Sequence, residues 1–258
     1  MINIDNSPRS KVEEKIAAMR EGGKILGNLL KDLKDYVQPG MTGKEIDAWV
    51  RKEIVKRGAK VAYDMLDDEF PGAICISVND ELVHGAPKDE PLEEGDKVSF
   101  DLDIYYKGYF TDSAFTMLVG GKGSPAVKKM ISVTESSMWE GIEQVKPGAT
   151  IGTIGAAVEK VLEKDHLGVI KNYVGHGIGK SMHEEPEVPN YGKKGHGYKL
   201  VEGDTICIEP MCCLGKPDNY CDQSDNWTVI IKDGSTACHC EHTVLVTKDG
   251  YEVLTLPD

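Results

Sequence analysis

Three aspartates lie close together in residues 97–115, KVSFDLDIYYKGYFTDSAF. Apolar and aromatic residues alternate on both sides of Lys107-Gly108, a pair suited to a tight turn, which predicts a β-hairpin. In that register Asp103 faces Asp112, and Asp101 lies diagonal to Asp112 on the same face. Carboxylates about 4 Å apart repel by roughly 4 kcal/mol per pair at an effective dielectric of about 20. The hairpin therefore requires either a solvated polar face or a bound cation.

An internal repeat places a fourth acid at an equivalent position. Val37-x-Pro39-Gly40-x-Thr42 recurs 108 residues later, and so does Leu92-x-Glu94-Gly95-Asp96. The same offset maps Asp101 onto Glu209. Two copies are too few for a solenoid, so we expect one domain, residues 1–258, whose halves (roughly 10–118 and 119–250) pair about a pseudo-twofold axis. Acids from equivalent strands would converge at that axis.

Histidines and one further acid complete the candidate site. Glycines flank His176 in Gly175-His176-Gly177-Ile178-Gly179, and the absence of side chains there lets backbone or a ligand approach closely. His183 follows seven residues later, and His84 lies in a turn-like stretch between strands. Glu241 begins an apparent strand, in which alternation sends the next residue to the opposite face. The other histidines are interpreted as ordinary polar residues outside the site: His166, His196, His239 and His242.

Five of these residues supply four carboxylates and one imidazole: Asp101, Asp112, His176, Glu209 and Glu241. Four carboxylates grouped in a cleft cannot all stay ionised without cations. Two divalent ions balance the four charges, and oxygen and imidazole donors suit manganese, iron, cobalt or zinc. A metal pair lowers the pKa of a shared water towards about 7, which gives a bridging hydroxide able to attack a carbonyl. The chemistry indicated is hydrolysis.

Helices and short strands must position these residues. Helical spacing of apolar residues predicts a first helix from a capping box at Ser10 and Glu13 to Val37. A second opens with Thr42 and Glu45 and closes at Gly58, and short strands follow. A third is predicted from Ser124-Pro125 to Pro147-Gly148.

Composition narrows the class of protein. The chain has 258 residues, of which 40% are hydrophobic, enough for a substantial core. A net charge of -13 argues against a nucleic-acid groove or an anionic membrane surface. No export signal and no run of eighteen apolar residues is visible, and seven cysteines without a Cys-x-x-Cys pair favour reduced thiols. These features predict a cytoplasmic protein.

Five motifs then occur in a fixed order: Asp101 and Asp112 eleven residues apart, Gly175-His176-Gly177-Ile178-Gly179, His183-Glu184-Glu185-Pro186, Ile208-Glu209-Pro210-Met211, and Glu241-His242-Thr243. Their combination resembles the type I methionine aminopeptidases, and the likeness covers about residues 10–256. The resemblance implies an α+β pita-bread fold, with two pseudo-symmetric halves around a curved, mainly antiparallel sheet and a dinuclear metal site near its centre. It also implies removal of the N-terminal methionine from new polypeptides whose second residue is small, by a monomer that meets its substrates at the ribosome.

The resemblance further assigns roles to residues. Asp101 and Asp112 would bind one ion and bridge to the second, His176 and Glu209 would hold the other, and Glu241 would bridge. Glu209 would help take the proton from the attacking water, and two histidines would contact the substrate: His84 and His183. Four residues fall where the family lines its methionine pocket: Phe70, Cys75, Met182 and Trp227. The chain departs from the family in its acidic loop at residues 66–69 and in Asp103.

Other interpretations stay open at the level of sequence. Related pita-bread enzymes that cleave before proline or act on dipeptides use a similar metal set but carry a large extra N-terminal domain. Type II enzymes carry a helical insertion for which the path from His183 to Glu209 leaves no room. A binding protein that kept the fold without catalysis would not need all five ligands. An unrelated cation-binding module would need neither His84 nor His183.

Overall fold

The computed structural model describes residues 8–66 and 69–258. Its helices are α1 (Pro8–Tyr36), α2 (Gly43–Lys56), α3 (Pro125–Ile142) and α4 (Ile151–Lys164), with short 3-10 turns η1 (Tyr63–Met65) and η2 (Val119–Gly121). The strands of the first half are β1 (Lys60–Val61), β2 (Cys75–Val78), β3 (Glu81–Val83), β4 (Lys97–Tyr106) and β5 (Tyr109–Leu118). Those of the second half are β6 (Gly168–Val169), β7 (Gly175–Gly177), β8 (Glu184–Val188), β9 (Thr205–Ile208), β10 (Met211–Cys213), β11 (Asn219–Cys221), β12 (Val229–Ile231), β13 (Ala237–His239), β14 (Glu241–Val246) and β15 (Tyr251–Val253).

One nine-stranded sheet forms the centre of the molecule. Its main path runs β1-β4-β5-β14-β9-β7-β8, with β2 paired to β4 and β15 paired to β14. Two three-stranded sheets, β13-β10-β6 and β11-β12-β3, accompany it. Every pairing between described strands is antiparallel. The α+β class with a mainly antiparallel sheet is thus confirmed.

The β4–β5 hairpin has the predicted register. Tyr106 pairs with Tyr109, and Asp103 pairs with Asp112. Lys107 and Gly108 at the turn have φ of 47° and 95°, the positive values that a two-residue turn compatible with strand twist requires. The turn chemistry of the sequence therefore sets which carboxylates face each other.

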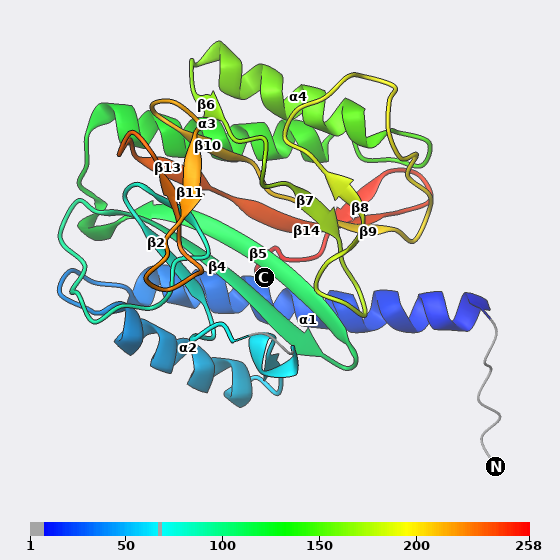
Figure 1. The fold of residues 1–258 in the computed structure, drawn as a ribbon. Coiled ribbons are helices and arrows are strands. Elements are labelled where there is room, and N and C mark those ends of the chain that lie inside the picture. Colours follow the sequence, from blue (N-terminus) through cyan, green and yellow to red (C-terminus); the bar gives the residue numbers. More distant parts are fainter. Residues whose placement is uncertain (1–7, 67–68) are drawn as a thin grey trace.

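Each half of the chain has its own hydrophobic core. In the first, Leu26 of α1 and Ile46 of α2 are fully buried with Phe100 of β4. In the second, Ile154 of α4 is fully buried in one cluster with residues of α3, β9 and β14. Figure 1 shows α1 and α2 on one side of the molecule and α3 and α4 on the other, with the long strands β4, β5 and β14 between them. The two cores hold the central strands from both sides.

Backbone contacts repeat at the offset seen in the sequence. The Gly40 amide donates to the Leu92 carbonyl at 2.7 Å, and the Gly148 amide donates to the Leu200 carbonyl at 2.8 Å. An isolated antiparallel bridge joins Thr42 to Pro91, and another joins residues 150 and 199. Both partners in each pair are displaced by the same offset, so the two loops that precede α2 and α4 are anchored in the same way.

Helix boundaries differ from prediction at two places. The first helix begins at Pro8, so Ser10 lies inside it rather than at its cap. The third ends at Ile142 instead of Pro147, since Val145 turns into the core, 1% exposed, and its amide bonds the Ile142 carbonyl in a tighter turn. The capping box of Thr42 and Glu45 is confirmed. Among the described helices, none is both long and apolar enough to cross a membrane.

Candidate metal centre and substrate pocket

The hairpin aspartates face a cavity of about 220 Å³ near the middle of the sheet. Asp101 and Asp103 come from β4 and Asp112 from β5, and all three line the cavity. Thr243 fixes the backbone of Asp112 by accepting from its amide at 3.0 Å and donating to its carbonyl at 2.7 Å. Asp103, which sequence analysis singled out without a role, is 3% exposed and belongs to this acidic group.

Strands of the second half bring the remaining candidates to the same cavity. His176 comes from β7, Glu209 follows β9, and Glu241 begins β14. A Cβ on Gly177 would lie 2.3 Å from the Glu185 carbonyl oxygen, so only glycine fits beside His176. The side chain of Asn190 donates to the Glu209 carbonyl at 2.9 Å. All five predicted ligands therefore line one cavity.

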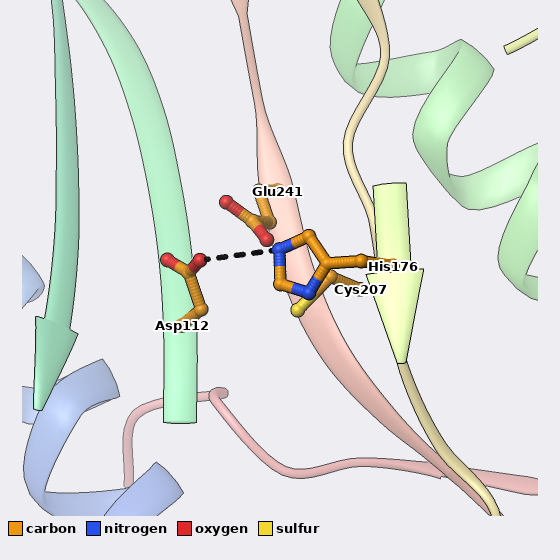
Figure 2. A group of neighbouring side chains, drawn as sticks. All are labelled: Asp112, His176, Cys207 and Glu241. Carbon is orange, nitrogen blue, oxygen red and sulfur yellow. Dashed lines mark ion pairs between the residues drawn. The ribbon is translucent and has the colours of Figure 1, made fainter. Parts of the chain in front are cut away.

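The separations between these groups suit a shared cation. His176 Nε2 lies 3.8 Å from Asp112 Oδ2 and 3.5 Å from Glu209 Oε1. Such distances are too long for good hydrogen bonds. Figure 2 shows Asp112, His176 and Glu241 pointing toward one another from three strands. Nδ1 of His176 lies 2.9 Å from the Gly177 carbonyl, which can only accept, so Nδ1 carries the proton and Nε2 presents its lone pair to the carboxylates.

Unsatisfied oxygens support the same conclusion. Asp101 Oδ1, Asp112 Oδ1 and Glu241 Oε1 are buried without a hydrogen-bond partner among the described residues. Burial raises the pKa of Glu209 to about 8, and it raises the pKa of Asp112 and of Glu241 well above their ordinary values, with neighbouring carboxylates adding to the effect. The protein groups alone leave this charge uncompensated. Divalent cations fit the donor set.

Two potential metal-binding side chains close to the predicted ligands were not predicted. The prediction that His239 is an ordinary polar residue is wrong, because its ring lines the cavity and lies near Glu209 and Glu241. Cys207 lies beside Asp112, His176 and Glu241, but burial raises the pKa of its thiol well above 9, so it stays protonated. Each precedes a predicted ligand by two residues, the spacing that puts two side chains on the same face of extended backbone. This two-residue spacing is the feature of the sequence from which both side chains could have been predicted.

The two predicted substrate-contacting histidines also line the cavity. The His183 ring lies 4.4 Å from the His176 ring, measured between centroids. His84 has φ of 56°, a left-handed backbone rare outside glycine. Burial, with His239 and His183 nearby, lowers the pKa of His84 to about 4, so its imidazole is neutral at neutral pH.

An aromatic wall closes one side of the cavity. The Phe70 ring lies 4.4 Å from the Tyr63 ring and 5.4 Å from the Trp227 ring, and Met182 adds a buried thioether. Cys75 does not line the cavity, and its sulfur lies 3.3 Å from the Tyr63 hydroxyl. Tyr63 is a lining residue that sequence analysis missed. Of the acidic loop before Phe70, Asp67 and Asp68 lie outside the described residues. None of the seven cysteines, all of which lie within the described residues, forms a disulfide.

Buried carboxylates and imidazoles around a small cavity that also has apolar walls are suited to metal-assisted hydrolysis. The fold and the site together define the chain as a metal-dependent hydrolase. Residues 17–248 match metallopeptidase family M24, and the chain belongs to this family. It is 38% identical over 246 residues to methionine aminopeptidase 1 of Bacillus subtilis, covering 95% of this chain and 98% of that protein.

Solved structures agree on the fold. The crystal structure of methionine aminopeptidase from Rickettsia prowazekii superposes with a TM-score of 0.91 at 36% identity, covering 95% of this chain and 98% of that one. The prolidase from Pyrococcus horikoshii has a TM-score of 0.76 at 25% identity, and the match spans 95% of this chain but only 63% of the prolidase. The pita-bread fold predicted from the motifs is confirmed.

Proposed function

We propose that this chain removes the N-terminal methionine from polypeptides whose second residue is small. It is a metal-dependent hydrolase of the aminopeptidase type. The observation that carries the proposal is the convergence of acids and imidazoles from both halves of the chain on one cavity beside an aromatic wall. The unit that acts is one catalytic domain, residues 1–258, whose halves, roughly 10–118 and 119–250, each supply part of the site.

Two divalent ions would be held by the five predicted ligands: Asp101, Asp112, His176, Glu209 and Glu241. Manganese, iron, cobalt and zinc all suit these donors. When bound, the ions offset the buried carboxylates, lower the pKa of a water and polarise the carbonyl to be attacked. The protein fixes the donors in advance through Gly177 and Thr243, so little reorganisation accompanies binding.

Glu209 and two histidines carry the proton movements in this proposal. The side chain of Glu209 accepts a proton from the attacking water and returns it to the departing amine. His84 and His183 line the cavity on the substrate side, where their imidazoles donate hydrogen bonds to the oxygen that becomes negative. The buried setting strengthens these hydrogen bonds relative to water.

The cavity limits what can enter. Its volume of about 220 Å³ lies below the range of about 300 to 1,000 Å³ typical of sites for drug-sized ligands, so it suits one side chain rather than a long segment. Phe70, Met182 and Trp227 give it an apolar wall for an unbranched thioether side chain, with Tyr63 beside them. Cys75 contributes to the same wall through the contact of its sulfur with the Tyr63 hydroxyl.

Cellular setting is part of the proposal. Seven cysteines outside any disulfide, six of them buried, favour a reducing compartment, which supports the cytoplasm. A monomer suffices because one chain supplies all the groups named above. The substrate is the start of a new polypeptide, so the enzyme would act on chains leaving the ribosome.

A peptide panel tests the proposal. Protein loaded with cobalt or manganese should release free methionine from Met-Ala peptides and leave Met-Ile and Met-Lys peptides intact, because bulky second residues do not fit beside the filled pocket. Chelator-treated protein is the control and should release none. Cleavage of Ala-Pro peptides in preference to Met-Ala peptides would instead favour the proline-specific relatives and contradict the proposal.

A further inference from the structure

His239 is a buried imidazole that the five-ligand site does not use. It ends β13 and is 1% exposed, and its ring lines the metal cavity. Neither ring nitrogen has a hydrogen-bond partner among the residues that the structure describes. An imidazole buried without any partner is costly, so a ligand at this point would relieve a real penalty.

The setting of His239 matches that of His176, the predicted imidazole ligand. Glu209 lies between the two rings: its Oε1 is 3.5 Å from His176 Nε2, and its Oε2 is 3.5 Å from His239 Nε2. His239 Nε2 is also 3.9 Å from Glu241 Oε2. The carboxylate of Glu209 thus has an imidazole nitrogen at the same distance from each of its oxygens.

The separations between His239 Nε2 and the two glutamates favour a shared ion over direct hydrogen bonds. N–H···O bonds in proteins are mostly about 2.7 to 3.2 Å long, so 3.5 Å is too long for a good one. Donors that bind one ion at about 2.1 Å stand about 3.0 to 3.5 Å apart, and the separation of 3.5 Å between His239 and Glu209 matches that range. The separation of 3.9 Å between His239 and Glu241 is slightly longer. Glu209, His239 and Glu241 also form a group whose ligand atoms lie within 4.8 Å of one another.

We infer that His239 Nε2 is a sixth protein ligand of the metal centre, binding the ion that Glu209 and Glu241 hold. This inference rests on the proposed metal site. The backbone of His239 is fixed for such a role, because Thr116 donates its hydroxyl to the His239 carbonyl at 2.5 Å and β13 pairs with β10 at Met211. The ring therefore enters the cavity from an anchored strand.

An added imidazole changes which ions the centre prefers. Imidazole suits zinc, iron and other borderline ions, whereas carboxylates and water suit manganese and magnesium. His239 should therefore strengthen cobalt binding more than manganese binding. Removing the ring should lower the affinity for cobalt by at least about tenfold and the affinity for manganese by less.

Proton NMR of the cobalt-loaded wild-type protein tests the inference without any mutation. Each imidazole bound to cobalt(II) gives an exchangeable N–H resonance far outside the ordinary range. Two such resonances are expected, one from His176 and one from His239. His239→Gln and His239→Ala should each remove one, and titration calorimetry should find their cobalt affinity reduced by at least about tenfold.

His242→Gln is the matched control. His242 lies one residue beyond Glu241 on β14, and its Nδ1 lies 2.8 Å from the Thr255 hydroxyl, away from the cavity. It should retain both resonances and the wild-type cobalt affinity. A single shifted resonance in wild-type protein, or wild-type cobalt affinity in both His239 variants, would overturn the inference. If His239 proves not to bind the metal but the protein still releases methionine, the proposed function stands. If the wild-type protein binds no cobalt, the inference and the proposed function both fail.

Discussion

The metal-free protein should become less stable as the pH rises. Burial raises the pKa of Glu209 from its ordinary 4.5 to about 8. Between those values the native carboxyl holds a proton that the unfolded chain has lost, so the unfolded state binds fewer protons. The free energy of unfolding then falls by up to about 1.4 kcal/mol per pH unit, about 5 kcal/mol in all from this one group. The pKa values of Asp112 and Glu241 are raised in the same direction.

Urea unfolding of chelator-treated protein, followed by the fluorescence of its three tryptophans, measures this effect. The midpoint should fall steadily from about pH 5 to about pH 8, and added cobalt or manganese should restore it most strongly at the higher pH, where binding displaces the fewest protons. Glu209→Gln cannot ionise and should show a shallower slope in the metal-free state. A metal-free wild-type protein whose stability is constant or rises across this range would refute the reasoning.

Three further substitutions test separate parts of the account. Glu209→Gln should lower kcat by about 100-fold or more while circular dichroism shows an intact fold, because it removes the proposed proton acceptor; full activity would remove Glu209 from the mechanism. Gly177→Ala puts a Cβ 2.3 Å from the Glu185 carbonyl oxygen and should reduce the metal content, measured by elemental analysis, by displacing His176; unchanged content would contradict this. Thr42→Ala should cost about 1 kcal/mol in urea unfolding through loss of the helix cap, with kcat unchanged.

Local sequence rules account for much of the fold. Lys107-Gly108 determined the hairpin register because only a few turn types close two strands with two residues, and the observed positive φ values match them. The side chain of Thr42 accepts from the Glu45 amide, and the side chain of Glu45 accepts from the Thr42 amide. This capping box spans only four residues, so it can be recognised in the sequence. The two copies of the internal repeat can also be recognised from short motifs, and their loops make equivalent backbone hydrogen bonds.

What the sequence did not reveal depends on contacts between distant strands. The role of His239 follows from pairing of β13 with β10 and from its distance to Glu209, neither of which a histidine between two cysteines signals. Tyr63 lines the cavity and Cys75 does not, because the Tyr63 side chain from the 3-10 turn η1 reaches the cavity and its hydroxyl contacts the Cys75 sulfur. The early end of α3 depends on burial of Val145 in the core.

The central claim is that acids from two halves of the chain hold a pair of cations, and anomalous diffraction from manganese-soaked crystals tests it most directly. Two peaks are expected inside the cavity, one next to the hairpin aspartates and one next to Glu209 and Glu241. An absence of peaks there, with manganese at surface carboxylates instead, would contradict it.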